Sequence, residues 1–89
     1  MDLNVAATVK VMPTGTDVDY KSIQKGIEDI VKKYGKVHSM EVKPLAFGLK
    51  SIEAVILLND GQGGIEEIES AVSKLKGVGS IETVDVNRL

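Results

Sequence analysis

The sequence predicts an α+β fold whose six elements follow one another in the order βαββαβ. Two observations lead to this prediction. Four segments alternate apolar and polar residues, which is typical of strands, and two segments repeat apolar residues at helical spacing. A helix then connects the first strand to the second and another connects the third to the fourth, and both crossovers must be right-handed. A ferredoxin-like sandwich satisfies this order, with a four-stranded antiparallel sheet that carries both helices on one face.

The first strand and the first helix have the clearest patterns. The strand is expected over residues 3–11, where every second residue is apolar. The helix is expected over residues 20–34, because its apolar residues share one face: Tyr20, Ile23, Ile27, Ile30, Val31 and Tyr34. Thr16 and Asp19 resemble a capping box before this helix, and Gly35 is expected as its C′ residue.

The second and third strands differ in their apolar surface. Residues 37–45 are more polar and include Pro44, which cannot donate a ladder hydrogen bond, so this strand is expected at an edge of the sheet. Residues 49–58 are apolar on one face and, in their second half, on both. The first and third strands are therefore expected at the centre of the sheet, and the second and fourth at its edges.

The rest of the chain predicts a second helix and a last strand. The Gly-rich residues 59–64 do not match a phosphate-binding loop and are interpreted as a flexible connection. The second helix has an apolar face formed by Ile65, Ile68, Val72 and Leu75. Acidic residues in its first turn and basic residues in its last complement the helix dipole: Glu66, Glu67, Lys74 and Lys76. Gly77 is expected to close this helix before a strand over residues 78–87.

Composition limits the class of protein. The 89 residues are expected to form a single domain, 1–89, without a transmembrane span or signal peptide. Cysteine is absent and there is one histidine, which excludes thiolate chemistry and the usual zinc sites and favours a cytoplasmic protein. The net charge of −2 gives no general attraction to nucleic acids or membranes, although most lysines lie in residues 1–50 and the C-terminal part is acidic.

Several functions known for this fold lack the residues that they need. RNA recognition on the open sheet face needs aromatic side chains, and the residues expected there have none: Asn4, Ala6, Thr8, Lys10, Ser51 and Glu53. A metal chaperone would need cysteines. An acylphosphatase-like site would need an arginine near the first strand, whereas the only arginine is Arg88.

Two groups of titratable residues are interpreted as structural. His38 stands alone on the expected edge strand without a predicted nucleophile, so a partly exposed structural role is favoured over general-base catalysis. The acidic residues of the C-terminal part could attract a divalent cation, but their spacing matches no EF-hand and favours a solvated face: Glu66, Glu67, Glu69, Glu82 and Asp85.

Two further features are not accounted for by the fold alone. Phe47, the only phenylalanine, lies at the connection between the second and third strands, where its ring could fold back over the core or stay exposed. The second feature is the final segment of residues 86–89, where Arg88 lies beside the terminal carboxylate. A frayed strand end is its simplest interpretation.

Both features fall within segments that resemble one family. Residues 44–52, with the sequence PLAFGLKSI, are similar to the P-(I/L)-x-F-G-(I/L)-K-K-L segment of translation elongation factor 1-beta. Residues 78–80 and 87–89 resemble its V-Q-S and terminal N-K-(I/L) segments. The short length resembles the archaeal form of this family.

The resemblance implies a guanine-nucleotide exchange factor that promotes GDP release from elongation factor 1-alpha. Such a factor performs no covalent chemistry and needs no cofactor or metal of its own. It would contact the GTPase but neither nucleic acid nor membrane, and would be a monomer when free. The partner-binding residues implied by the family motifs are Phe47, Gly48, Lys50, Asn87, Arg88 and Leu89.

The resemblance also assigns roles to two of these residues. Phe47 would insert against the GTPase, and Arg88 would reach the Mg²⁺ and phosphate region of the bound nucleotide. The chain departs from the family pattern at both segments, because Ser51 replaces a lysine and Arg88 replaces another. The alternative is a small ferredoxin-like module, RNA-associated or regulatory, that uses its open sheet face.

Overall fold

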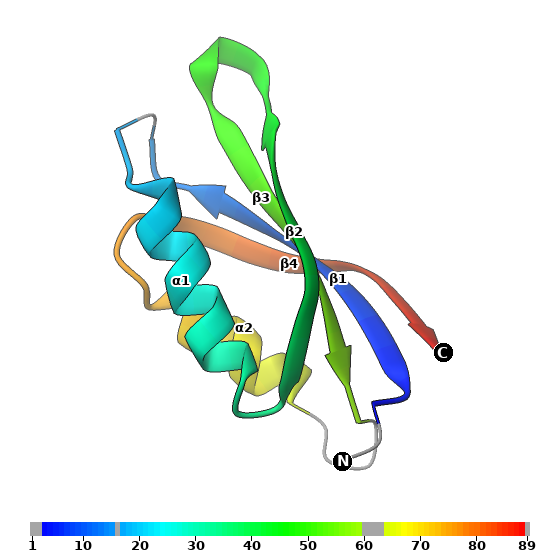
Figure 1. Cartoon of the computed structure of the whole chain (residues 1–89). Helices are drawn as coiled ribbons and strands as arrows, with labels where there is room; N and C mark the ends of the chain where they lie inside the picture. The colour runs from blue at the N-terminus through cyan, green and yellow to red at the C-terminus, as the bar shows by residue number, and fades with distance from the viewer. Residues whose placement is uncertain (1–2, 16, 60–63, 89) are drawn as a thin grey trace.

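The computed structural model describes residues 3–15, 17–59 and 64–88. The element order βαββαβ is as predicted, with one short 3₁₀ turn between the second and third strands (Figure 1). The elements are β1 (Val5–Pro13), α1 (Tyr20–Val31), β2 (Gly35–Pro44), η1 (Ala46–Gly48), β3 (Lys50–Leu58), α2 (Ile65–Ser73) and β4 (Val78–Arg88).

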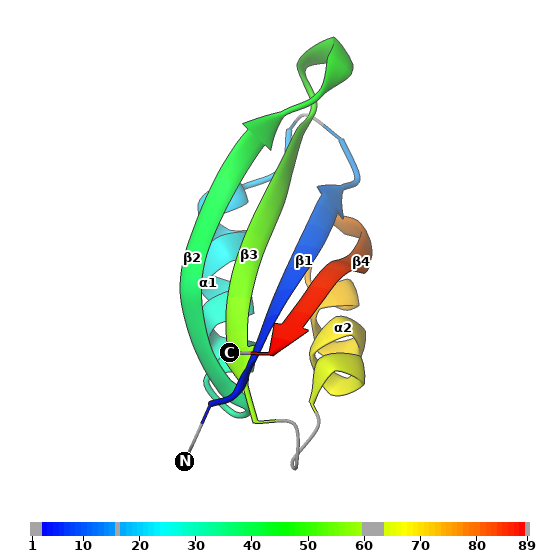
Figure 2. The ribbon, with the colours of Figure 1, turned by 90° about the vertical axis from the view of Figure 1, so that its right-hand side faces the viewer.

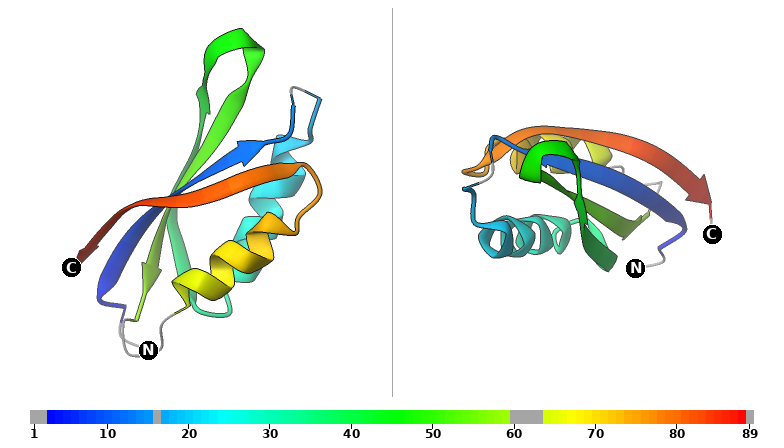
Figure 3. Two further views of the ribbon diagram at one scale, coloured as in Figure 1. Left: turned by 180° about the vertical axis from the view of Figure 1, so that it is seen from behind. Right: turned by 90° about the horizontal axis from the view of Figure 1, so that it is seen from above.

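The four strands form one antiparallel sheet in the order β2-β3-β1-β4 (Figure 2). β1 and β3 are therefore central and β2 and β4 are edges, which confirms the positions expected from their apolar patterns. Both helices cover the same face of the sheet and leave the opposite face open (Figure 3). α1 packs mainly against β2 and α2 against β4, so each helix lies over one side of the sheet.

The core lies between the two helices and the central strands. The inward residues of β1 and β3 alternate as expected and are almost fully buried: Val5, Ala7, Val9, Val11, Ile52, Ala54, Ile56 and Leu58. The helices contribute the apolar faces that the sequence predicted, with Ile23, Ile27, Val31, Ile68 and Val72 at 2% exposure or less. Periodicity therefore located the part of the core that β1, β3 and the two helices contribute.

The ends of α1 differ from the expectation. Asp19 itself is the N-cap, and its side chain accepts a hydrogen bond from the Ser22 amide at 3.2 Å. Thr16, the other half of the expected capping box, lies outside the described residues. The prediction of Gly35 as a C′ residue was wrong, because α1 ends at Val31 and Gly35 begins β2. A side chain at Gly35 would collide with the carbonyl oxygen of Leu57, so strand packing requires this glycine.

α2 is also shorter than its apolar pattern suggested. Glu66 and Glu67 occupy its first turn as expected, but the helix ends at Ser73. The two lysines expected in the last turn instead follow the helix. The prediction that Gly77 closes this helix was wrong, because the C-cap is Lys74 and Gly77 lies four residues beyond Ser73. Its φ of +92° places it in a left-handed turn before β4.

Three register shifts mark bulges on the edge strands. Each lies where one edge-strand residue has no partner in the register, at His38 of β2 and at Gly79 and Val84 of β4. The bulge at His38 puts Val37 and Met40, three residues apart, on the same inward face of β2. No helix in the described residues is long and apolar enough to cross a membrane.

Candidate partner-binding surfaces

The connection between β2 and β3 projects beyond the rest of the sheet (Figures 1 and 2). β1 pairs with β3 only as far as Ile52, so beyond that residue β2 and β3 continue as a two-stranded ribbon. The ribbon ends at η1, where the Leu45 amide donates a hydrogen bond to the Leu49 carbonyl oxygen at 2.6 Å. This closed tip carries Phe47.

Phe47 is 96% exposed. Of the two arrangements that the sequence left open, the structure has the exposed one. Its backbone has φ 62° and ψ 30°, and Gly48 follows with φ 80°, so two successive residues adopt the left-handed conformation. This conformation is uncommon for an aromatic residue and costs roughly 1 kcal/mol or more for a side chain with a Cβ. The tight turn therefore holds a large apolar ring outward at a local cost in stability.

An ion-pair network crosses the two strands below this tip. Glu41 and Glu53 are directly opposite each other in the register, an arrangement that is repulsive by itself. Lys43 Nζ lies 2.7 Å from Glu53 Oε2 and 3.8 Å from Glu41 Oε2. Hydrogen bonding to Glu53 and its negative charge, with a smaller effect of Glu41, raise the pKa of Lys43. The sequence interpretation missed this network because it depends on cross-strand register.

The two residues after Leu49 differ in exposure. Lys50 begins β3 opposite Pro44 and is exposed. Ser51 was expected on the open sheet face but is buried, with 1% of its surface exposed. It lies opposite Lys43 in the register, at the base of the ribbon. Ser51 is therefore a small buried side chain, and of these two residues only Lys50 supplies an exposed charge.

The C-terminal residues lie at the opposite end of the sheet. Arg88 pairs in register with Val5 at the start of β1, and Asn87 Nδ2 donates a hydrogen bond to Asp85 Oδ2 at 2.8 Å. Both Asn87 and Arg88 are exposed, whereas Leu89 lies outside the described residues. The hairpin tip and Arg88 are thus separated by at least the length of β3, nine residues or about 26 Å.

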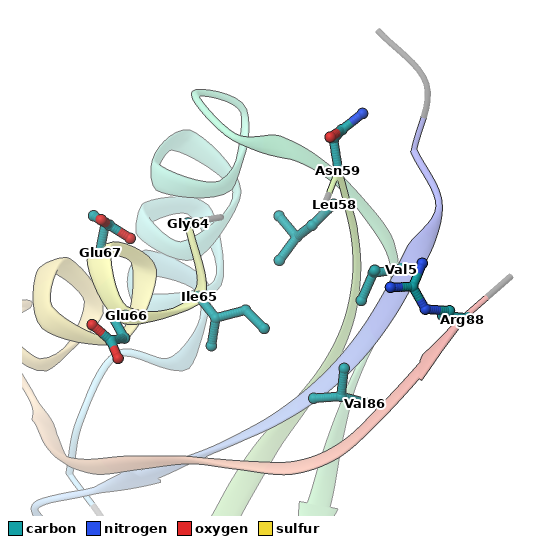
Figure 4. Close-up of a pocket in the computed structure, with 9 residues that line it drawn as sticks. All are labelled: Val5, Leu58, Asn59, Gly64, Ile65, Glu66, Glu67, Val86 and Arg88. Carbon is teal, nitrogen blue, oxygen red and sulfur yellow. The ribbon is translucent and has the colours of Figure 1, made fainter. Parts of the chain in front are cut away.

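A pocket of about 540 Å³ lies beside Arg88 (Figure 4). Its apolar lining comes from the ends of three strands and the start of α2: Val5, Leu58, Ile65 and Val86. Asn59, Gly64, Glu66, Glu67 and Arg88 complete it. Gly64 is the N-cap of α2 and makes no side-chain cap hydrogen bond. The pocket therefore combines the guanidinium of Arg88, the carboxylates of Glu66 and Glu67, and an apolar wall, at the end of the sheet where β4 ends.

The acidic residues of the C-terminal part do not come together. Glu69 on α2 accepts a hydrogen bond from Thr83 Oγ1 at 3.2 Å, on the helix side of the sheet. Glu82 is paired in register with Lys10, and Asp85 with Thr8, on the open side. Within the described residues no group of three or more His, Cys, Asp or Glu side chains could hold a metal ion. These acids are dispersed over two faces.

His38 is exposed at the bulge of the edge strand β2. It lines a groove between β2 and α1 together with Lys32 and Lys36. The expectation of a partly exposed histidine on an edge strand therefore agrees with its position. Sequence periodicity did not indicate this bulge, which leaves His38 without a partner in the register of β3.

Fold and surface together define a ferredoxin-like domain that presents an aromatic hairpin tip at one end and a cationic strand end at the other. The fold is shared with the ACT domain from GTP pyrophosphokinase of Chlorobium tepidum, with a TM-score of 0.64 and 12% sequence identity over 91% of this chain and 99% of that one. A likeness at this identity concerns the fold alone.

Sequence comparison identifies the family. The model of the EF-1 guanine nucleotide exchange domain matches residues 6–89. Elongation factor 1-beta of Methanothermobacter thermautotrophicus is 37% identical over 86 residues, which cover 97% of each chain. The elongation factor 1-beta proteins of Methanobrevibacter smithii and Thermoplasma acidophilum are 38% and 33% identical, over 96% and 94% of this chain and 96% of each of theirs. The chain belongs to the EF-1 guanine nucleotide exchange domain family, as its sequence segments indicated.

Proposed function

We propose that this chain promotes GDP release from elongation factor 1-alpha, and so its loading with GTP, during translation elongation. Family membership supports the exchange activity. The structural observation that carries the proposal is Phe47, which is 96% exposed on a left-handed turn at the tip of a projecting hairpin. An apolar ring held out in this way has little to contribute to the fold and is suited to burial in a partner.

In this proposal the two ends of the domain have separate tasks. Phe47, flanked by Gly48 and Lys50, inserts into the surface of the GTPase and anchors the complex. Arg88, with Asn87 and Leu89, reaches toward the bound nucleotide. The two ends are about 26 Å apart along β3. The GTPase therefore has to contact the domain along its long dimension of 39 Å.

The chemistry of exchange follows from charge. A GTPase holds GDP through Mg²⁺ and through the backbone amides and lysine of its phosphate loop. A guanidinium placed at the metal site competes with Mg²⁺ for the phosphate oxygens. The attachment of GDP to the GTPase is thereby weakened. By linkage, bound GDP weakens the binding of the exchange factor to the GTPase to the same degree. The factor makes and breaks no covalent bond.

The same proposal includes the state of the free protein. Residues 1–89 act as a single exchange domain, monomeric when free, in the cytoplasm where translation occurs. The open sheet face supports the alternative of RNA binding less well. Its central positions in the described residues, among them Ala6, Thr8 and Val55, carry no aromatic ring on which bases could stack.

The direct test is GDP release from an archaeal elongation factor 1-alpha loaded with a fluorescent GDP analogue and chased with excess GTP. Substoichiometric amounts of this chain should accelerate release, because an exchange factor turns over. Release that proceeds at the spontaneous rate with micromolar protein would refute the proposal. Binding of RNA without acceleration would favour the alternative.

A further inference from the structure

A groove of about 480 Å³ lies on the side of the domain formed by α1 and β2. It runs between the C-terminal end of α1, where Glu28 and the C-cap residue Lys32 lie, and the continuous strand segment of residues 36–40. Glu28 and Lys32 are four residues apart and so lie on the same side of the helix. The groove is separate from the hairpin tip and from the Arg88 pocket, whose linings share no residue with it.

The rim of this groove is mainly basic. Lys32, Lys36 and His38 line it against one carboxylate, Glu28. Lys32 makes only a long ion pair, 4.0 Å to Asp29, between two highly exposed side chains. Lys36 makes no ion pair within the described part of the chain. Positive charge at the rim is therefore available to an anionic partner.

The floor of the groove is apolar and partly buried. Val37 and Met40 pack against the core on one side and line the groove on the other. They share this face because of the bulge at His38. Methionine adapts its shape to different apolar groups, which suits a contact surface.

The strand that forms one wall of the groove has an unpaired edge. β2 is the outermost strand of the sheet and pairs only with β3 among the described strands. A strand edge beside a helix is a geometry in which extended peptides bind, since their backbone can pair with the strand while their side chains enter the groove. The segment of residues 36–40 spans about 13 Å from its first to its last residue, the length of five extended residues.

We propose that this groove binds a short acidic peptide segment of a partner protein in extended conformation. Its carboxylates lie beside Lys32 and Lys36, and an apolar side chain between them rests on Val37 and Met40. The positive charge of Lys32 and Lys36 favours an acidic segment. The apolar floor favours a peptide over RNA, because the phosphates of RNA would leave Val37 and Met40 uncovered.

The test uses the whole chain and a fluorescein-labelled hexapeptide of alternating glutamate and valine, with binding followed by fluorescence anisotropy. Binding should weaken as salt is added, because the charges at the rim are exposed. The amide signals of residues 36–40 should shift in a heteronuclear NMR spectrum. The peptide in which glutamine replaces glutamate should bind at least about tenfold more weakly, since it keeps the apolar contacts but loses the charges.

A matched pair of variants locates the site. Lys32→Glu with Lys36→Glu should weaken peptide binding at least about tenfold. Lys21→Glu with Lys25→Glu changes the net charge equally on the same helix but outside the groove, and should leave binding within about twofold. Neither pair should alter acceleration of GDP release, so the result is independent of the proposed exchange activity. Equal loss in both pairs, shifts confined to other strands, or tighter binding of single-stranded oligouridylate of equal charge would each overturn the proposal.

Discussion

The ammonium group of Lys43 lies 2.7 Å from Oε2 of Glu53, across the two strands that carry the exposed ring of Phe47. Glu41 faces Glu53 directly, so without Lys43 two carboxylates would repel each other at the base of the ribbon. The lysine turns this repulsion into an attractive network on the open face of the sheet. The network lies where the hairpin leaves the support of β1.

Lys43→Met is expected to lower the melting temperature modestly at neutral pH, because the Lys43–Glu53 pair is partly exposed to solvent. Its pH dependence has a definite sign. Glu53 raises the pKa of Lys43 above the ordinary value of 10.5, so the stabilisation is fully present below that value and is lost as pH rises through the folded-state pKa. Thermal unfolding of both proteins across this range should show the difference shrinking at alkaline pH. A difference that grows there would contradict this origin.

Phe47→Ala is expected to leave the fold intact and to lower acceleration of GDP release at least about tenfold, because a large exposed anchor is lost. The free energy of unfolding should change by less than about 0.5 kcal/mol, as for other surface residues. Circular dichroism with thermal unfolding and the exchange assay measure the two effects. If the variant unfolds, Phe47 supports the fold and the proposed role is wrong.

Phe47→Gly separates backbone strain from the loss of the ring. Glycine adopts a φ of 62° without steric cost, which relieves roughly 1 kcal/mol of strain but adds freedom to the unfolded chain. We therefore expect the glycine variant to be at least as stable as the alanine variant and equally poor in exchange. Urea unfolding of the two variants compares their stabilities. A glycine variant less stable than the alanine variant would show that the left-handed turn is not strained.

Much of the fold followed from the sequence because it depends on periodicity. The inward faces of β1, β3 and both helices are set by alternation or helical spacing, and these predictions were confirmed. The ends of elements depend instead on local contacts. Gly35 was assigned to a helix end because glycine is common there, whereas its reason is the Leu57 carbonyl oxygen, a neighbour 22 positions further along the chain.

The candidate surfaces were only partly predictable. The position of Phe47 at a hairpin tip followed from Pro44 and Gly48, but its exposure did not, since its left-handed conformation is one that sequence statistics disfavour for an aromatic residue. The ion pair of Lys43 required the cross-strand register. Predicting the groove beside β2 would have required knowledge of the bulge at His38, which the pattern of apolar residues does not indicate.

Gly35→Ala tests the strand-packing explanation. The added methyl group would collide with the Leu57 carbonyl oxygen, which is fixed by the sheet, so the free energy of unfolding should fall by more than about 2 kcal/mol. Gly15→Ala is the matched control, because its methyl group would meet only Asp17 Oδ1 at an ordinary 3.4 Å. Urea denaturation compares the two. Equal stability of both variants would mean that β2 shifts to accept the methyl group.

Arg88→Met and Arg88→Lys test the cationic end. We expect the methionine variant to lose most of the acceleration and the lysine variant to keep much of it, because a lysine retains the charge but not the planar donor geometry. Competition with Mg²⁺ adds a sharper measurement. Acceleration by the unmodified chain should fall as free Mg²⁺ rises, and acceleration by Arg88→Met should depend on Mg²⁺ much less. If acceleration by both proteins depends on Mg²⁺ in the same way, Arg88 does not act near the Mg²⁺ site.

The separation of Phe47 and Arg88 predicts how their losses combine. Phe47 lies beyond the start of β3, and Arg88 of β4 lies level with the far end of β3, so the two residues are at least about 26 Å apart and line no common pocket in the described residues. Mutations so far apart usually act independently, so the loss of transition-state stabilisation in the double variant Phe47→Ala with Arg88→Met should equal the sum of the single losses to within about 0.5 kcal/mol. Phe47→Ala should act mainly on the concentration of factor needed for half-maximal exchange, and Arg88→Met mainly on the maximal rate. These values come from titrating each variant against nucleotide-loaded elongation factor 1-alpha. A strong departure from additivity would indicate that binding at the hairpin tip has to precede insertion of Arg88, so that the two ends act in sequence on one partner.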